Sequence, residues 1–309
     1  MKYLHAVSAF LQATQGRFAD VTGLDIELFL AQWEAESQRR TGTRPRPATV
    51  RARIAALRSF FDFAQRASLL IALNPMDNVV SPASEQRPND FLRPIEDAAL
   101  MAADLPPQER ILVWLLRWTG LRVSEGCALR LQDLDLSPGR ECVVVRKSKT
   151  AAGLRTIPVV PVLVPELERW LSLLPAQGLS PQAALLSTRT GSAFKPSYVW
   201  RLIKRAGARA EVRPVACTCH STRRTRHEKG CARTASGENV SAITPHTLRR
   251  TFGSDLLNKG LRLEVVSRLL GHSNTVVTER AYAQLLGSTI RDELLSVLSE
   301  ADTAVSLRP

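Results

Sequence analysis

Apolar residues in the N-terminal part of the chain recur at the spacing of a helix with one buried face. Val50, Ile54, Leu57 and Phe61 stand at i, i+4, i+7 and i+11, which puts them on one side of a helix. Leucine and valine recur in the same way in the first dozen residues, where polar residues interrupt the apolar run. This pattern predicts an N-terminal amphipathic helix and not a secretion signal.

A stretch rich in proline separates this helical part from the rest of the chain. Residues 73–94 hold four prolines and several turn-forming residues, a composition typical of an interdomain linker. We therefore expect a helical domain over residues 1–80, a linker over 81–94 and a second domain over 95–309.

The second domain is predicted to combine helices with a short antiparallel hairpin. The β-branched segments ECVVVR (141–146) and LRTIPV (154–159) are bounded by turns and predict two strands, joined by the basic segment KSKTAAG. Ser124 is the expected N-cap of a short helix that has Glu125 in its first turn. Further helices are expected from Ile95 onward, over 108–118, over about 163–174 and over about 196–209. The fold class is therefore mainly α, with an α-rich α+β second domain.

Charge changes this picture by indicating a partner. The chain of 309 residues has a formal net charge of +13 and a pI of about 10.3, while 44% of its residues are apolar. Such a surplus favours a polyanion, because each Lys or Arg that meets a phosphate releases a counterion. A solvated basic surface is the alternative. Five cysteines do not suit a secreted disulfide framework, and no apolar run has the length of a membrane span, so we expect a cytoplasmic protein.

Arginines crowd the approach to the helix predicted around residues 50–61 and its other faces. A core stripe backed by arginines suits a helix that lies on a phosphate backbone, and any solvated helix of a basic protein shows it too. The candidate DNA contacts in this region are Arg44, Arg46, Arg51, Arg53 and Arg58.

Four separated segments carry candidate chemistry: TGLRVSE (119–125), RKSKT (146–150), PHTLRRTF (245–252) and LLGHSNTVVTERAY (269–282). The chain has neither a Walker A loop nor an HExxH motif. Two arginines from these segments, if they converge, suit a pentavalent phosphorus with excess negative charge, without a metal ion. A lysine or histidine can protonate the leaving oxygen, and a tyrosine in such a positive field can attack.

The third segment, PHTLRRTF, combines two residue types that suit phosphate chemistry. Pro245 indicates the start of a helix, so His246 and Arg249 share one face. Arg249 can present a planar fork to two phosphate oxygens, and His246 can transfer a proton near neutral pH. A plain surface pair is the alternative for this motif alone, as a core aromatic is for Tyr282.

Taken together, the four segments resemble the tyrosine recombinase (phage integrase) family of site-specific DNA recombinases. TGLRVSE resembles the family's first arginine box, PHTLRRTFGSDLLNKG its HxLRHTFAT helix, and LLGHSNTVVTERAYA its LGHxxxxxTxxxY segment. The similarity extends from about residue 95 to 285, with the tyrosine one position later than in the commonest spacing. It implies an N-terminal SAM-like core-binding helical bundle before the catalytic domain, and favours a simple Xer-like or transposon-type recombinase.

The resemblance implies a role for each matching residue. Arg122 and Arg249 would grip the scissile phosphate. Tyr282 would attack phosphorus, form a 3′-phosphotyrosyl bond and release a 5′-hydroxyl. His246 would assist proton transfer, and His272 would hydrogen-bond a phosphate oxygen or the transferring proton.

Two further positions support this chemistry. Glu125 matches the acidic residue of the family and would hold the geometry of the site without reacting. The lysine of the hairpin would protonate the 5′ leaving oxygen. We favour Lys149 for this role because SKT matches relatives with a longer hairpin, and Lys147 is the alternative, or a DNA contact.

The resemblance also implies the partners. These are double-stranded DNA with roughly palindromic sites, two protomers on each site and a homo-tetramer when two sites pair, with accessory or directionality proteins in some systems. No ATP, cofactor, obligatory metal or membrane is required. The competing hypotheses are a catalytically inactive DNA-binding or architectural protein on the same scaffold, and a metal-dependent nuclease.

An insert over about residues 210–244 departs from the compact family pattern. Cysteine and histidine at close spacing suggest zinc, but the Cys-x-Cys gap is tighter than usual, and we favour a basic loop that touches DNA or a partner protomer. The alternative metal ligands are Cys217, Cys219, His220, His227 and Cys231, and the candidate DNA contacts are Arg223, Arg224 and Arg226.

The last segment, about residues 288–309, carries an apolar stripe at helical spacing, formed by Ile290, Leu294, Leu295 and Leu298. Such a helix would dock on a neighbouring protomer or on its own domain.

Overall fold

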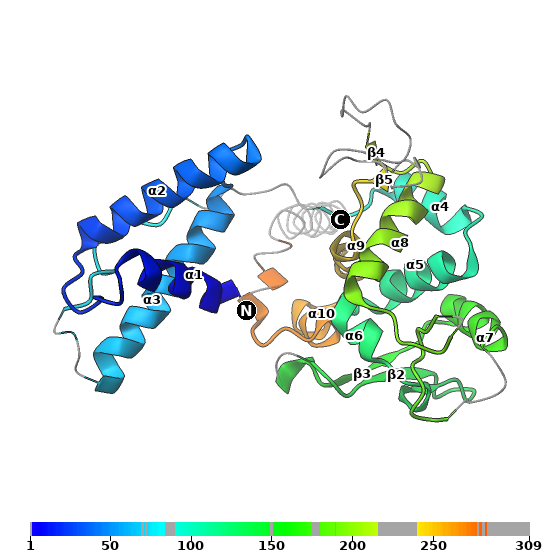
Figure 1. Cartoon of the computed structure of the whole chain (residues 1–309). Coiled ribbons are helices and arrows are strands. Elements are labelled where there is room, and N and C mark those ends of the chain that lie inside the picture. Colours follow the sequence, from blue (N-terminus) through cyan, green and yellow to red (C-terminus); the bar gives the residue numbers. More distant parts are fainter. Residues whose placement is uncertain are drawn as a thin grey trace, which may run out of the picture. The chain divides into compact units, whose positions relative to one another are not determined.

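Two compact units make up the chain. The computed structural model describes residues 2–68, 71, 73–83, 90–148, 151–174, 180–188, 190–215, 240–276, 278–279 and 282. Contacts divide the chain into Met1–Pro88 and Asn89–Pro309 (Figure 1). Each unit has a hydrophobic core of its own. No helix in the described part of the chain is long and apolar enough to cross a membrane.

The N-terminal unit is helical, as predicted. Val50, Ile54, Leu57 and Phe61 are all buried along one helix, so the hydrophobic stripe read from the sequence is its core face. The ring of Phe10 packs edge-on against that of Phe61, with ring centroids 5.6 Å apart. The helices described in this unit are α1 (Lys2–Ala13), α2 (Gly23–Thr41) and α3 (Pro47–Ser68).

Part of the proline-rich stretch belongs to this core. Met76 and Val79 are buried in the N-terminal unit, although the sequence indicated a linker over 73–94. The guanidinium of Arg58 donates to the carbonyl of Val79 at 3.0 Å. Backbone turns after Asn74 therefore bring apolar side chains back against α3, which composition alone does not indicate.

The larger unit is built around one apolar helix. The run 111–116 lies within α5, which packs against α7, α8 and α9 (Figure 1). The expected helices over 108–118, 163–174 and 196–209 are confirmed within a few residues. The helices described in this unit are α4 (Pro94–Ala102), α5 (Pro107–Thr119), α6 (Val123–Ala128), α7 (Val164–Ser172), α8 (Pro196–Arg209), α9 (Pro245–Asn258) and α10 (Leu263–Leu270), with short 3₁₀ turns η1 (Leu131–Asp133), η2 (Ala151–Gly153) and η3 (Pro161–Leu163).

The predicted hairpin is present. Val143 pairs with Ile157 and Cys142 with Pro158 in antiparallel register, and both Val143 and Ile157 are buried. A short first strand, which the sequence did not indicate, completes the order β1-β2-β3, and a separate two-residue pair closes the base of the insert. The strands are β1 (Leu134–Asp135), β2 (Cys142–Val145), β3 (Arg155–Pro158), β4 (Pro214–Val215) and β5 (Val240–Ser241).

The expected N-cap at Ser124 is wrong. Helix α6 begins at Val123 with Arg122 as its N-cap, and Glu125 stands at the third helical position. The backbone N–H of Arg122 donates to the Glu125 carboxylate at 2.9 Å. This carboxylate satisfies an otherwise unpaired N–H, as in a capping box, and so starts the helix earlier than a serine cap would.

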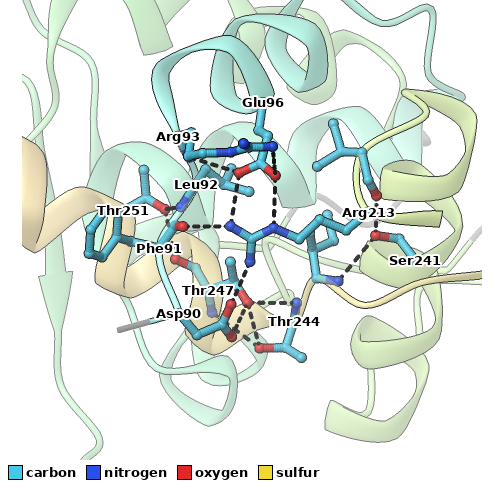
Figure 2. A network of polar contacts seen from close by, with 12 residues as sticks. Asp90, Phe91, Leu92, Arg93, Glu96, Arg213, Ser241, Thr244, Thr247 and Thr251 are labelled. Atoms are coloured by element: carbon cyan, nitrogen blue, oxygen red, sulfur yellow. Dashed lines mark hydrogen bonds and ion pairs between the residues drawn. The ribbon is translucent and has the colours of Figure 1, made fainter. Parts of the chain in front are cut away.

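A polar network joins the segment before α4 to the start of α9 (Figure 2). Asp90 accepts from the hydroxyl of Thr247 at 2.7 Å, and the backbone N–H of Leu92 donates to the hydroxyl of Thr251 at 2.8 Å. Arg213 donates to Asp90 at 2.7 Å and to Glu96 at 2.8 Å. The first turns of α9, which carry His246 and Arg249, are therefore held to the segment before α4.

Gly120 ends α5 in the left-handed region, with φ of 60°, and a methyl group there would overlap the ring of Phe252. We expect Gly120→Ala to lower the free energy of unfolding of this unit by about 2–4 kcal/mol, the sum of left-handed strain and overpacking. Gly260→Ala is the matched control, because Gly260 also has positive φ but nothing lies within 4 Å of the added carbon. Denaturant unfolding of both variants measures the difference, and equal losses would contradict this packing.

Candidate active site

A buried carboxylate lies at the centre of the candidate site. Glu125 is 2% exposed and accepts hydrogen bonds from Arg122 Nη1 at 2.7 Å, Ser148 Oγ at 2.9 Å and Arg155 Nη2 at 3.1 Å. Burial alone would raise the pKa of Glu125, but the hydrogen bonds from Arg155 and Arg122 bring it to about 2. The group is therefore ionised at neutral pH and orients two arginines, as the sequence-based hypothesis for Glu125 requires.

Helix α10 ends in the middle of the arginines. The C-terminal carbonyls of a helix carry partial negative charge and no intrahelical partner. Three consecutive carbonyls of this end each accept from a different guanidinium group, supplied by β3, α9 and the N-cap of α6. The bonds are Arg155 Nε to Leu269 O at 2.6 Å, Arg249 Nη2 to Leu270 O at 2.5 Å and Arg122 Nη2 to Gly271 O at 2.8 Å.

Arg249 is the more deeply buried of the two predicted phosphate-binding arginines. It is 5% exposed, and it also donates to the carbonyl of Gly120. Burial, together with the charge of Arg122, lowers the pKa of Arg249 to about 10. Arg249 therefore stays charged at neutral pH, while the Arg122 side chain, 29% exposed, forms the open side of the cluster.

His272 is held as a neutral ring in one orientation. Arg249 Nη2 lies 3.1 Å from His272 Nε2, and Thr278 Oγ1 lies 2.7 Å from His272 Nδ1. Because a guanidinium only donates, Nε2 accepts and the ring proton resides on Nδ1. Burial and the charges of Arg249, Arg122 and Arg155 lower the pKa of His272 to about 4.

His246 lies on the first turn of α9 and remains partly open to solvent. Desolvation and the nearby charges of Arg249, Arg250 and Arg122 lower its pKa, while Asp90 acts in the opposite direction. The structure thus brings Arg122, His246, Arg249 and His272 within electrostatic reach of one another.

Tyr282 lies in an apolar cluster beside this group. The side chain is 2% exposed and packs with Phe252, Val266 and Leu270. Its phenol oxygen fills the space that a side chain at Gly253 would take. Burial raises the pKa of Tyr282 to about 12, although Arg249 and Arg250 act to lower it. In this state the tyrosine has the core position that the sequence left open as the alternative.

The structure leaves some candidates outside the described residues. Lys147 is exposed beside a cavity of about 240 Å³ that Glu125 also lines, but Lys149 is not described. The candidates of the insert and of the C-terminal stripe are not described either. Among the described residues, no group of three or more His, Cys, Asp or Glu side chains could hold a metal ion.

Arginines of the N-terminal unit differ in their surroundings. Arg53 stacks over the ring of Trp33, with its guanidinium carbon 4.1 Å from the ring centroid, and Arg58 holds the Val79 carbonyl as described above. Arg44 and Arg46 are exposed and Arg51 is half-buried. Arg53 therefore packs within its own unit, and Arg44 and Arg46 are the more open candidates for DNA contact.

Sequence reasoning missed three residues of the site: Arg155, Ser148 and Thr278. Arg155 shares strand parity with the buried Ile157, a signal that it points inward. Thr278 is the threonine of the LGHxxxxxTxxxY segment, so the motif contained it without indicating its bond to His272.

Comparison with known proteins matches the chain to the family that its sequence motifs resemble. The model of the phage integrase family matches residues 91–288. A "Tyrosine recombinase" of Pseudothermotoga lettingae is 30% identical over 94% of this chain and 87% of its own length. "Tyrosine recombinase XerC" of Staphylococcus carnosus is 32% identical over 80% of this chain and 74% of its own.

Solved structures show the same fold at low sequence identity. The XerH site-specific recombinase bound to a palindromic difH substrate aligns with a TM-score of 0.68 at 16% identity, covering 96% of this chain and 79% of that one. The Tn1549 transposon integrase in complex with a circular intermediate DNA aligns at 0.64 and 18% identity, covering 91% and 86%.

Replacing Glu125 by Gln should change how stability depends on pH. The folded pKa of about 2 lies below the ordinary 4.5, so the ionised group contributes stability above about pH 4.5 that is lost as the pH falls toward 2, about 3 kcal/mol in all. Denaturant unfolding between pH 7 and pH 3 should therefore show a steeper loss in the wild type than in Glu125→Gln. Parallel curves would contradict the assignment; Glu96, whose pKa is also about 2, contributes equally to both proteins.

Gly253→Ala should expel the Tyr282 phenol from its apolar position, because the added methyl group would occupy the space of the oxygen. Nitration at pH 8, followed by peptide mapping, should modify the half-exposed Tyr3 in the wild type and spare Tyr282. In Gly253→Ala, Tyr282 should react at least about tenfold faster. Gly207→Ala, which forces a methyl group against Ile243 instead, is the control and should leave Tyr282 protected; reaction of Tyr282 in the wild type at the rate of Tyr3 would refute the buried position.

Proposed function

The chain belongs to the phage integrase family of tyrosine recombinases, and we propose that it is a site-specific DNA recombinase that breaks and rejoins DNA through a covalent 3′-phosphotyrosine. The observation that carries this proposal is the gathering of Arg122, Arg249 and His272 at the end of α10. Tyr282 packs against Gly253 of α9, the helix that also carries Arg249. Besides burial, the charges of Arg249 and Arg122 lower the pKa of both His246 and His272, which supports the same grouping.

The cationic groups fit the requirements of phosphoryl transfer. A DNA phosphodiester is negatively charged, and its pentavalent transition state concentrates charge on the non-bridging oxygens. Arg122 on the open side and Arg249 behind it would stabilise that charge in a partly dehydrated site. Prearranged guanidinium groups could thus do the work for which many nucleases use a metal ion.

In the first step the phenol oxygen of Tyr282 forms a bond to phosphorus while the bond from phosphorus to the 5′ oxygen breaks. The phenol proton passes to a neutral imidazole, for which we propose His246, because its pKa is lowered and Nε2 of His272 already accepts from Arg249. A proton reaches the 5′ oxygen from the hairpin lysine, for which we propose Lys149. Attack by a 5′-hydroxyl on the phosphotyrosine reverses these changes and rejoins DNA, so no ATP is consumed.

Tyr282 has to leave its apolar position before it reacts. Its raised pKa makes the buried phenol a poor nucleophile, and the proposal therefore includes a conformational step that brings the oxygen to the arginines. We propose that this step accompanies assembly of protomers on paired, roughly palindromic sites, with a tetramer as the active form. Exposed Arg44 and Arg46 of the N-terminal unit would contribute DNA contacts.

A covalent adduct on DNA tests this function. The chain's own site is first recovered by sequencing DNA bound to it in cells and is then built into a nicked suicide substrate. We expect the wild-type protein to form a covalent adduct in the presence of EDTA. Tyr282→Phe should reduce adduct formation at least about 10³-fold while site binding stays within about threefold.

Arg249→Met should lose about 10²–10³-fold in adduct rate, because it removes transition-state charge stabilisation. An adduct that persists in Tyr282→Phe would exclude this tyrosine as the nucleophile. Site binding by the wild type without any adduct would instead favour a catalytically inactive DNA-binding protein on this scaffold, the alternative that the buried phenol makes worth testing.

A further inference from the structure

We propose that Arg155 is a positioning residue of this site, which sets the orientation of Arg122 and His272 toward the scissile phosphate without contacting DNA. This inference rests on the proposed function, because it concerns the same phosphate. It names a third arginine that the motifs of the sequence do not contain.

The contacts of Arg155 favour a role that acts through other protein groups. Its side chain is 7% exposed. Each of its three nitrogens already donates within the protein: Nε to Leu269 O at 2.6 Å, Nη1 to Gly153 O at 2.8 Å and Nη2 to Glu125 at 3.1 Å. These bonds use three of the five N–H groups and, unlike those of Arg249, they include Nε, so the guanidinium holds protein groups through every nitrogen.

Those groups come from three separate segments of the unit. Gly153 belongs to the turn before β3, Glu125 to the first turn of α6 and Leu269 to the last turn of α10. Arg155 is therefore the side chain that fixes the β-hairpin, the arginine-bearing N-terminus of α6 and the end of α10 to one another. The rigid planar fork of arginine suits such a three-way contact.

The turn after α10 carries the effect to the phosphate-binding groups. The guanidinium of Arg155 lies directly against Gly271, where an added carbon would be 2.7 Å from Nη1. The carbonyl of Gly271 holds Arg122 at 2.8 Å, and His272 follows in the chain. If Arg155 is removed, the 269–271 carbonyls lose one of three donors and Glu125 loses one of its partners, so both Arg122 and His272 are free to shift.

A substrate with a neutral phosphorus separates positioning from general damage. Exchange of one non-bridging oxygen for a methyl group, a methylphosphonate, removes the charge that Arg122 is arranged to meet. On the normal phosphate we expect Arg155→Met to lower the adduct rate about 10²-fold, the cost of a misplacement near 1 Å. On the methylphosphonate the loss should be about tenfold or less. Arg155→Lys keeps the charge and part of the contacts, and its loss on the phosphate should be intermediate.

The matched control is Arg110→Met. Arg110 makes a two-pronged ion pair with Glu166, at 2.6 and 2.5 Å, that joins α5 to α7 away from the site. Any loss in this variant should be the same on both substrates. Equal losses for Arg155→Met on phosphate and methylphosphonate would assign Arg155 a merely structural role and overturn the proposal.

A second measurement needs no DNA cleavage. In the wild type, the nitrogen spectrum of the His272 ring should show the single neutral tautomer with its proton on Nδ1, assigned by comparison with His272→Gln. Arg155→Met should produce a mixture of tautomers, whereas Arg110→Met should not. An unchanged His272 spectrum in Arg155→Met overturns the positioning role even if the wild-type protein forms no adduct, a result that would separately refute the proposed function.

Discussion

The structure of the site depends on the negative end of α10. A helix C-terminus leaves carbonyls without partners, and here three consecutive ones attract three guanidinium groups from different parts of the unit. The arginines repel one another, and burial together with this repulsion lowers the pKa of Arg249. The helix end and the Glu125 carboxylate together offset this repulsion.

The cluster keeps a surplus of positive charge, because three guanidinium groups face a single carboxylate. Burial and that surplus together lower the pKa of both His246 and His272, which favours the neutral imidazoles. A phosphodiester would supply the missing negative charge. The network of Asp90 and Arg213 in Figure 2 connects α9, the helix that carries His246 and Arg249, to the segment before α4. These contacts limit how far the helix can move when a phosphate binds.

The nucleophile candidate is kept apart from this charge by ordinary packing. An aromatic ring in an apolar cluster is stabilised by burial, and the phenol fits because residue 253 has no side chain. If the Tyr282 side chain leaves that position, it loses apolar contacts, but its oxygen comes closer to the positive charge of the arginines. Burial therefore favours one position and electrostatic attraction the other.

The sequence by itself indicated most of the elements and the family, and it singled out candidate site residues. Strong periodicity defined α3, α5 and the β2–β3 hairpin, and Arg122, His246, Arg249, His272 and Tyr282 stood out because their motifs are local in the chain. Local sequence rules failed at two places. The Glu125 carboxylate, and not Ser124, accepts the hydrogen bond that begins α6. Met76 and Val79 pack into the core of the N-terminal unit, although the composition of their segment is typical of a linker. Only the tertiary structure showed Arg155 as the link among three segments and Tyr282 as buried. Arg155 reaches Leu269 across 114 positions, and Tyr282 packs against α9 and α10. Such contacts between separate elements leave no periodic trace in a single sequence.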